Sequence, residues 1–109
     1  MKFLRNILRR LSDRLPRHIA KRVDAFPESG MGYTVVAVKT KDGRIFRQIV
    51  MTSDMMGYFG VRFEDFDNPD TELPFRLRDV IDVEWEGYRV GNTIKKPESF
   101  KDEWKLSRS

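Results

Sequence analysis

Apolar residues near the start of the chain recur every three or four positions, which is the spacing of one face of a helix. The series comprises Phe3, Leu4, Ile7, Leu8, Leu11, Leu15, Ile19 and Val23. Pro16 interrupts it, because proline donates no backbone N–H and disfavours a helical residue before it. The pattern therefore predicts an amphipathic helix that is kinked at Pro16, or split there into helices at about 2–14 and 16–24.

Strand-like runs follow a short break in this pattern. Residues 27–32 contain one proline and two glycines, a composition that predicts a linker. The runs at 33–40 and 44–51 are rich in β-branched and aromatic residues, and they flank Asp42-Gly43. This pair predicts a tight hairpin, because glycine readily adopts the positive φ that the turn requires.

Later segments provide further strand candidates, at 57–63, within 75–87 and at 88–94. In the middle one, Ile81, Val83 and Trp85 alternate with acidic residues. This alternation predicts a strand whose solvated face carries Asp82, Glu84 and Glu86. The segment 97–107 carries two aromatic residues four positions apart, and we expect a short C-terminal helix or an ordered tail there.

These elements predict an α+β fold in which the N-terminal helix packs on a small, mostly antiparallel five-stranded sheet. The length of 109 residues fits one compact domain. Within it we expect a basic amphipathic helical segment at 1–26, the linker at 27–32, and a small β-rich unit with its C-terminal tail at 33–109.

One pair of segments resembles a known class of fold. The rhythm of VVAVKTKDGRIFRQIVM, followed later by PFRLRDVIDVEWEG, is similar to that of small SH3-like and Sm-like barrels. In those barrels a Lys-Asp-Gly turn joins two bent strands, and a later strand closes the sheet. The resemblance covers about residues 33–86. It implies a partly closed barrel as an alternative to the open sheet, and it implies no function.

The formal net charge of +4 conceals an uneven distribution. Residues 1–23 carry eight Lys or Arg and one acid, whereas residues 63–87 carry two Lys or Arg and nine acids. The two segments therefore have net charges of +7 and −7. We expect burial of the apolar stripe to determine where the helix packs, and these opposite charges to set its orientation.

The basic face of the helix is the candidate partner-binding surface, comprising Arg9, Arg10, Arg14, Arg17, Lys21 and Arg22. The first interpretation is a small non-enzymatic binding or assembly module. Its helix would dock on its own sheet or on a neighbouring subunit, with a protein partner or self-association as the outcome.

Two alternative functions remain open. A nucleic-acid-associated protein would use the same basic face to neutralise phosphates. A sheet-based form of this alternative would combine Arg44, Arg47 and Arg62 with Phe46, Tyr58 and Phe59. A peripheral membrane protein would instead lay the amphipathic helix on an anionic lipid surface.

Other classes of function find little support in the sequence. The chain has no cysteine, which excludes disulfides, thiolate metal sites and a cysteine nucleophile. His18 is the one histidine, and neither a nucleophile elbow nor a phosphate-binding glycine loop occurs, so we expect no enzyme, cofactor or small-molecule substrate. The acidic cluster at 64–72 contains Pro69 and lacks the glycine of a calcium loop, which indicates a solvated loop or a docking face rather than a metal site. No apolar run approaches the roughly 20 residues that span a bilayer, and we expect a cytoplasmic protein.

Overall fold

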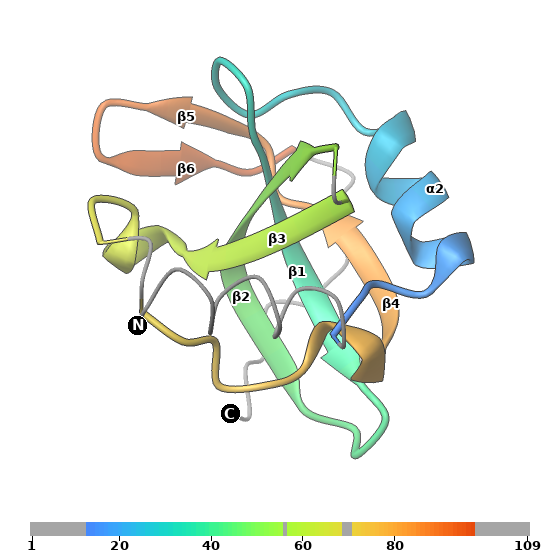
Figure 1. Ribbon diagram of the computed structural model, residues 1–109. Coiled ribbons are helices and arrows are strands. Elements are labelled where there is room, and N and C mark those ends of the chain that lie inside the picture. The colour runs from blue at the N-terminus through green and yellow to red at the C-terminus, as the bar shows by residue number, and fades with distance from the viewer. Residues whose placement is uncertain (1–12, 56, 69–70, 98–109) are drawn as a thin grey trace.

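A bent antiparallel sheet forms the centre of the molecule (Figure 1). The structure is a computed structural model that describes residues 13–55, 57–68 and 71–97. The larger sheet has the strand order β3-β2-β1-β4, and a separate two-stranded ladder joins β5 to β6. The strands span Thr34–Thr40 (β1), Ile45–Asp54 (β2), Gly57–Arg62 (β3), Val80–Trp85 (β4), Tyr88–Val90 (β5) and Thr93–Lys95 (β6). The prediction of a small α+β domain with an antiparallel sheet is confirmed.

One α-helix accompanies the strands in the described residues: α2, at Arg17–Ala25. Pro16 directly precedes it with φ −54° and ψ 145°, and its carbonyl oxygen accepts hydrogen bonds from Ile19 and Ala20. Residues 13–16 are not helical, so no continuous helix passes through Pro16. The split predicted there is therefore confirmed for the second helix, while the predicted first helix at 2–14 lies almost entirely outside the described residues, as does the predicted C-terminal helix or tail.

The hairpin predicted at Asp42-Gly43 is confirmed. β1 pairs with β2 across this turn, and Gly43 has a φ of 85°. The sheet itself differs from the five-stranded prediction, because residues 88–94 do not add a strand to it. Gly91 adopts a φ of 63°, and the chain turns back there to form the short β5–β6 hairpin.

The larger sheet is not closed into a barrel by strand pairing within the described residues. β3 and β4 are the outer strands of the larger sheet, and they do not pair with each other within the described residues. The SH3-like or Sm-like barrel therefore stays a prediction.

One face of the sheet is covered by α2 and by the segment that leads into β4. This segment contains a short 3₁₀ helix, η2, at Leu77–Asp79. The buried residues of this layer are Leu15, Ile19, Val23, Val36, Val38, Phe46, Ile49, Met51, Phe75, Leu77, Val80 and Val83. The part of the apolar stripe that lies in α2 is thus part of the core of its own chain.

The opposite face of the sheet has a smaller core. Tyr33, Val35, Val50, Val61 and Ile94 are buried there. The β5–β6 hairpin supplies Ile94, and the short 3₁₀ helix η1 (Phe63–Asp65) with the residue after it supplies further aromatic rings. Both faces of the small sheet are therefore covered.

Three polar contacts fix α2 and the segment that follows it. The hydroxyl of Tyr58 at the start of β3 donates to Asp24, and burial together with this carboxylate raises the pKa of Tyr58 above its usual range. In the 27–32 segment, the buried hydroxyl of Ser29 accepts the amide N–H of Val35 at 2.7 Å, and its carbonyl oxygen accepts the amide N–H of Arg89 at 2.8 Å. The residues assigned to a linker thus form an ordered connection between β1 and β5.

A β-bulge bends β2, and a buried carboxylate holds it. The pairing of β1 with β2 changes register between Val36 and Val38, so that Arg47 and Gln48 both lie opposite Ala37. Gln48 has a φ of 56°, a value that is unfavourable for a residue with a side chain. The fully buried Glu86 accepts the backbone N–H of Gln48 through Oε2, and Nε and Nη2 of Arg47 through Oε1 at 3.0 and 2.6 Å.

This arrangement overturns the prediction that Glu86 lies on the solvated face of its strand. β4 ends at Trp85, and Glu86 follows it at the point where the backbone turns toward the bulge. Conversely, Ile81 was predicted to face inward and is 46% exposed. Strict alternation fails here because β4 changes register against β1 between Lys39 and Thr40.

The first prediction tests whether α2 belongs to the core. Ile19→Ala removes a fully buried side chain and should lower the free energy of unfolding by about 2–5 kcal/mol. The exposed His18→Ala on the same helix is the control and should change it by less than about 0.5 kcal/mol. Urea unfolding followed by circular dichroism measures both, and equal midpoints for the two variants would show that α2 is not part of the core.

The second prediction concerns the buried ion pair. Glu86→Gln leaves Arg47 without its charged partner, and it should lower the free energy of unfolding by about 3–5 kcal/mol. The matched control is Glu84→Gln on β4, which removes the same charge from a partly exposed position. If both variants unfold at the same urea concentration, the carboxylate of Glu86 does not stabilise the bulge.

Candidate functional site

The structure separates the six predicted partner-binding residues into three groups. Arg9 and Arg10 lie outside the described residues. Arg14, Arg17 and Lys21 are exposed. Arg22 is exposed as well, but Nη1 forms an ion pair with Asp82, and Nη2 donates to the carbonyl oxygen of Val83 at 2.7 Å.

Arg22 therefore has a structural role at the outer edge of β4. The backbone N–H of Val83 is occupied too, because it donates to the Asp82 carboxylate at 2.9 Å. Outer strands with open N–H and C=O groups can pair with other chains, and charged side chains commonly prevent this. The Arg22–Asp82 pair blocks the middle of this edge.

The sequence of α2 explains why its two faces differ. Leu15, Ile19 and Val23 follow one another at four-residue spacing and are buried. Arg17 and Lys21 are also four residues apart, and they project from a different face because each residue advances the helix by about 100°. Burial of the apolar stripe therefore places these cations in solvent.

The carboxylate of Asp13 fixes the residues that precede α2. The two oxygens of Asp13 accept the backbone N–H groups of Leu77 and Arg78, at 3.0 and 2.9 Å. This contact joins the residues before α2 to η2, although about sixty positions separate them in the sequence. Arg14 consequently lies beside the η2 segment.

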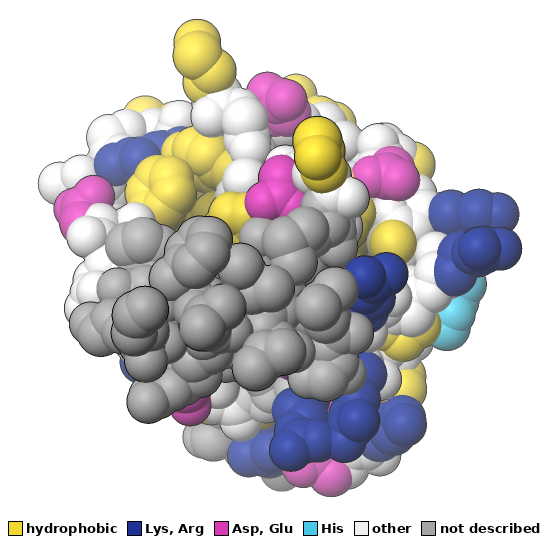
Figure 2. Space-filling view, viewed as in Figure 1, with side chains coloured by type: hydrophobic (Ala, Val, Ile, Leu, Met, Phe, Trp, Pro, Cys, Tyr) yellow, Lys and Arg dark blue, Asp and Glu magenta, His cyan; other side chains and the backbone are white. Residues whose placement is uncertain are grey.

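Two arginines of that segment extend the basic region of α2. Phe75 and Leu77 are buried, whereas the alternating Arg76 and Arg78 are exposed. We define the basic surface as Arg14, Arg17, Lys21, Arg76 and Arg78. None of these five side chains forms an ion pair within the part of the chain that the structure describes. Figure 2 shows Lys and Arg side chains gathered over the side that carries α2 and over the end of the sheet near η2.

The sequence analysis did not identify Arg76 and Arg78, because both belong to the segment with a net charge of −7. Most carboxylates of that segment are engaged locally. The ion pairs are Arg62 with Glu64 (3.5 Å) and Asp65 (2.9 Å), Lys41 with Asp79 (3.8 Å), Arg22 with Asp82, and Arg47 with Glu86. Five of the nine carboxylates of the segment therefore have a described cation partner, and one of these ion pairs, that of Arg22, joins the segment to α2.

The residues suggested for a sheet-based nucleic-acid surface are instead engaged in contacts within the chain. Phe46 is buried in the core, and Arg47 is paired with Glu86. Arg62 is paired with two carboxylates, and Tyr58 donates to Asp24. These residues do not form an open surface of cations and aromatic rings.

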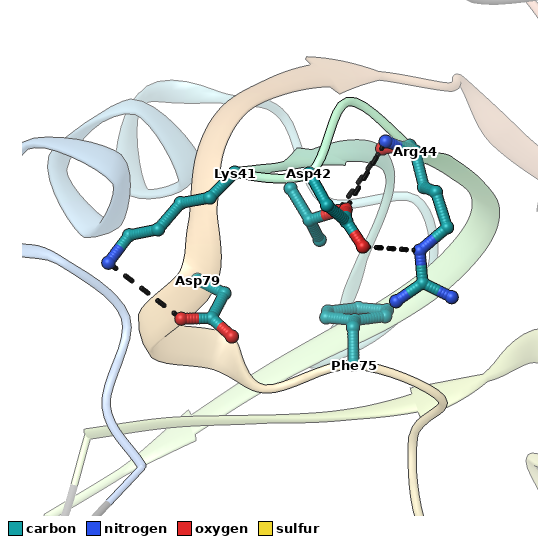
Figure 3. A pocket seen from close by; sticks show the side chains of 6 residues that line it. Lys41, Asp42, Arg44, Phe75 and Asp79 are labelled. Carbon is teal, nitrogen blue, oxygen red and sulfur yellow. Dashed lines mark hydrogen bonds and ion pairs between the residues drawn. The ribbon is translucent and has the colours of Figure 1, made fainter.

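A shallow pocket of about 160 Å³ lies beside the β1–β2 turn (Figure 3). Its polar side chains contact one another. Lys41 points toward Asp79, and Arg44 Nε donates to Asp42 at 2.7 Å. The hydrogen bond from Thr40, with smaller contributions from Arg44, lowers the pKa of Asp42. The groups that line the pocket stabilise the turn and its neighbour η2.

Two other classes of function have no structural counterpart among the described residues. No three His, Asp or Glu side chains come together as a potential metal site in them. Among the same residues, no helix has the length and apolar character needed to cross a membrane. His18 is exposed on α2, away from the pocket residues.

Comparison of the chain with protein-family models, with curated proteins and with solved structures found no match.

Proposed function

We propose that the protein is a non-enzymatic binding module that presents the basic surface to a polyanionic partner. The observation that supports this proposal is the contrast between the buried apolar face of α2 and its exposed basic face. Its apolar side chains complete the core, and its cations, joined by Arg76 and Arg78, stay in solvent without ion pairs among the described residues. Cations gathered on one face create a positive potential that attracts negatively charged partners.

The lack of ion pairs distinguishes this surface from several other cations of the described chain, although Arg89 and Lys95 have none either. Elsewhere in the described residues, cations such as Arg22, Arg47 and Arg62 have carboxylate partners. A surface ion pair contributes little to stability, so the absence of ion pairs at these five positions costs the fold little. These five side chains are therefore available for a partner outside the chain.

The membrane alternative receives less support from α2. An interfacial helix must insert its apolar face among lipids, and the apolar side chains of α2 are already buried against the sheet. The remaining apolar residues of the predicted stripe, from Phe3 to Leu11, lie outside the described residues.

The test uses heparin as a polyanion and two double variants of the full chain. Arg17→Gln/Lys21→Gln removes two charges from the basic surface, and Lys95→Gln/Lys96→Gln removes two exposed charges from the other side of the sheet. We expect the first variant to elute from heparin at lower salt than the unmodified chain. When heparin affinity is measured at several salt concentrations, the slope of log affinity against log salt should become less steep by about two, one for each lost contact.

The second variant serves as the control, because it has the same net charge. It should elute close to the unmodified chain. Equal shifts for both double variants would mean that net charge alone governs retention, and the proposal would then be wrong.

A further inference from the structure

We infer that the basic surface binds the phosphate backbone of a nucleic-acid duplex without reading its sequence. This inference rests on the proposed function and names the partner of the same surface. It depends on which groups the surface contains, on which groups it lacks, and on how its charges are spaced.

The surface combines side-chain charge with the end of a helix. Arg14 and Arg17 lie at the N-terminus of α2, where the helix dipole is already positive. The first turn contains no acidic residue, and no side chain caps it. The nearby carboxylate of Asp13 is occupied by the backbone of the η2 segment. Asp13 keeps its negative charge, so Arg14, Arg17 and Asp13 together carry a net charge of +1 next to the positive helix end, which is a favourable environment for phosphate.

The spacing of the cations suits a phosphate backbone. Four residues of α-helix span about 6 Å, which separates Arg17 from Lys21 along α2. Arg76 directly precedes η2, and Arg78 lies in its first turn, where each residue of a 3₁₀ helix rises about 2 Å, so these two arginines are also closely spaced. A duplex carries one negative charge per about 1.7 Å of its axis, so closely spaced cations meet a dense row of phosphates. Arginine also matches phosphate geometry with two parallel hydrogen bonds.

The surface offers few apolar anchors for a protein or membrane interface. The large exposed hydrophobic residues of the described chain are Met31, Met55, Ile81, Tyr88 and Val90, and Ile81, three residues after Arg78, is the one that lies near the basic surface in sequence. Met31 and Met55 lie in turns at the far end of the sheet, where Thr34 pairs with Met51, whereas η2 lies at the end where Thr40 pairs with Val80. Protein interfaces depend on buried aromatic or apolar side chains, and interfacial helices insert apolar groups into lipid.

The same composition favours a duplex over a single strand. Single-stranded nucleic acid is held largely by aromatic side chains on which the bases stack. The basic surface contains no aromatic residue, and its arginines and lysine can contact only the backbone unless they enter a groove. Contacts to phosphates fix position but carry no sequence information.

The acidic segment does not prevent this binding. A net charge of −7 over residues 63–87 would repel a polyanion if its carboxylates were unpaired and near the surface in question. Asp79, the last residue of η2, and Asp82, three residues further on, each form an ion pair. Glu86 is fully buried with Arg47.

The test measures fluorescence anisotropy of a short labelled DNA duplex with the full chain. With about five phosphate contacts, the slope of log affinity against log salt should lie near −4.5, and affinity should fall on the order of 10²- to 10³-fold between about 50 and 200 mM salt. Arg76→Gln/Arg78→Gln should reduce the slope by about two, whereas Lys95→Gln/Lys96→Gln should leave it unchanged. A second duplex of different sequence should bind with the same affinity within about threefold.

Competing probes separate failure of this inference from failure of the proposed function. Tighter binding at the basic surface to polyglutamate, to vesicles of phosphatidylglycerol and phosphatidylcholine, or to a single strand would overturn the duplex and leave the binding surface intact. An Arg76→Gln/Arg78→Gln variant that binds the duplex like the unmodified chain would also overturn the inference. Binding to no polyanion, heparin included, would refute both proposals. All four substituted side chains are exposed, so each variant should fold, and circular dichroism checks this.

Discussion

The buried contact between Glu86, Arg47 and the backbone of Gln48 determines the shape of the molecule. Gln48 adopts a backbone conformation that costs about 1–2 kcal/mol for a residue with a side chain. The carboxylate of Glu86 offsets this by accepting the Gln48 N–H and by neutralising Arg47. The bulge adds one residue to β2, so that side chains before and after it can face the same core layer. Phe46, Ile49 and Met51 pack on the side of α2, and Val50 packs on the side of the β5–β6 hairpin.

The same contact fixes where the chain leaves the larger sheet. The backbone N–H of Glu86 still donates to the carbonyl of Val35 in β1, and Gly87 follows with a φ of 115°. A Cβ at Gly87 would lie 1.9 Å from the carbonyl oxygen of Lys95, so only glycine allows this close approach of β6. Glu86 and Gly87 together direct β5 and β6 over the second core, where Ile94 is buried.

Local chemistry made much of this fold predictable, and distant contacts made the rest unpredictable. Pro16, Asp42-Gly43 and the stripe through Ile19 and Val23 act within one turn or one helix, so their patterns identify the elements directly. The side chain of Glu86 is different, because its burial depends on a bulge that lies about forty positions earlier in the chain. The two-residue alternation of β4 contains no information about that bulge, and it assigned Glu86 to solvent.

The electrostatics of the candidate site could not be predicted from the sequence either. A sum of charges over residues 63–87 describes an acidic segment, yet Arg76 and Arg78 are exposed on it, and most of its carboxylates are paired nearby. The contact of Asp13 with the η2 backbone, which joins these arginines to α2, depends on tertiary structure and leaves no pattern in the sequence.

The position of arginines at the start of α2 is the strongest support for an anionic partner. A cation in the first turn of a helix is unfavourable by about 0.3–1 kcal/mol, and an acid there would be stabilising by a similar amount. Arg17 occupies the first residue of α2, Arg14 lies just before it, and no acid balances them in that turn. Neither side chain contributes to the buried core or to a described ion pair. Arg17 is therefore unfavourable at the start of the helix in the free chain, and an external anion is the group that would make it favourable.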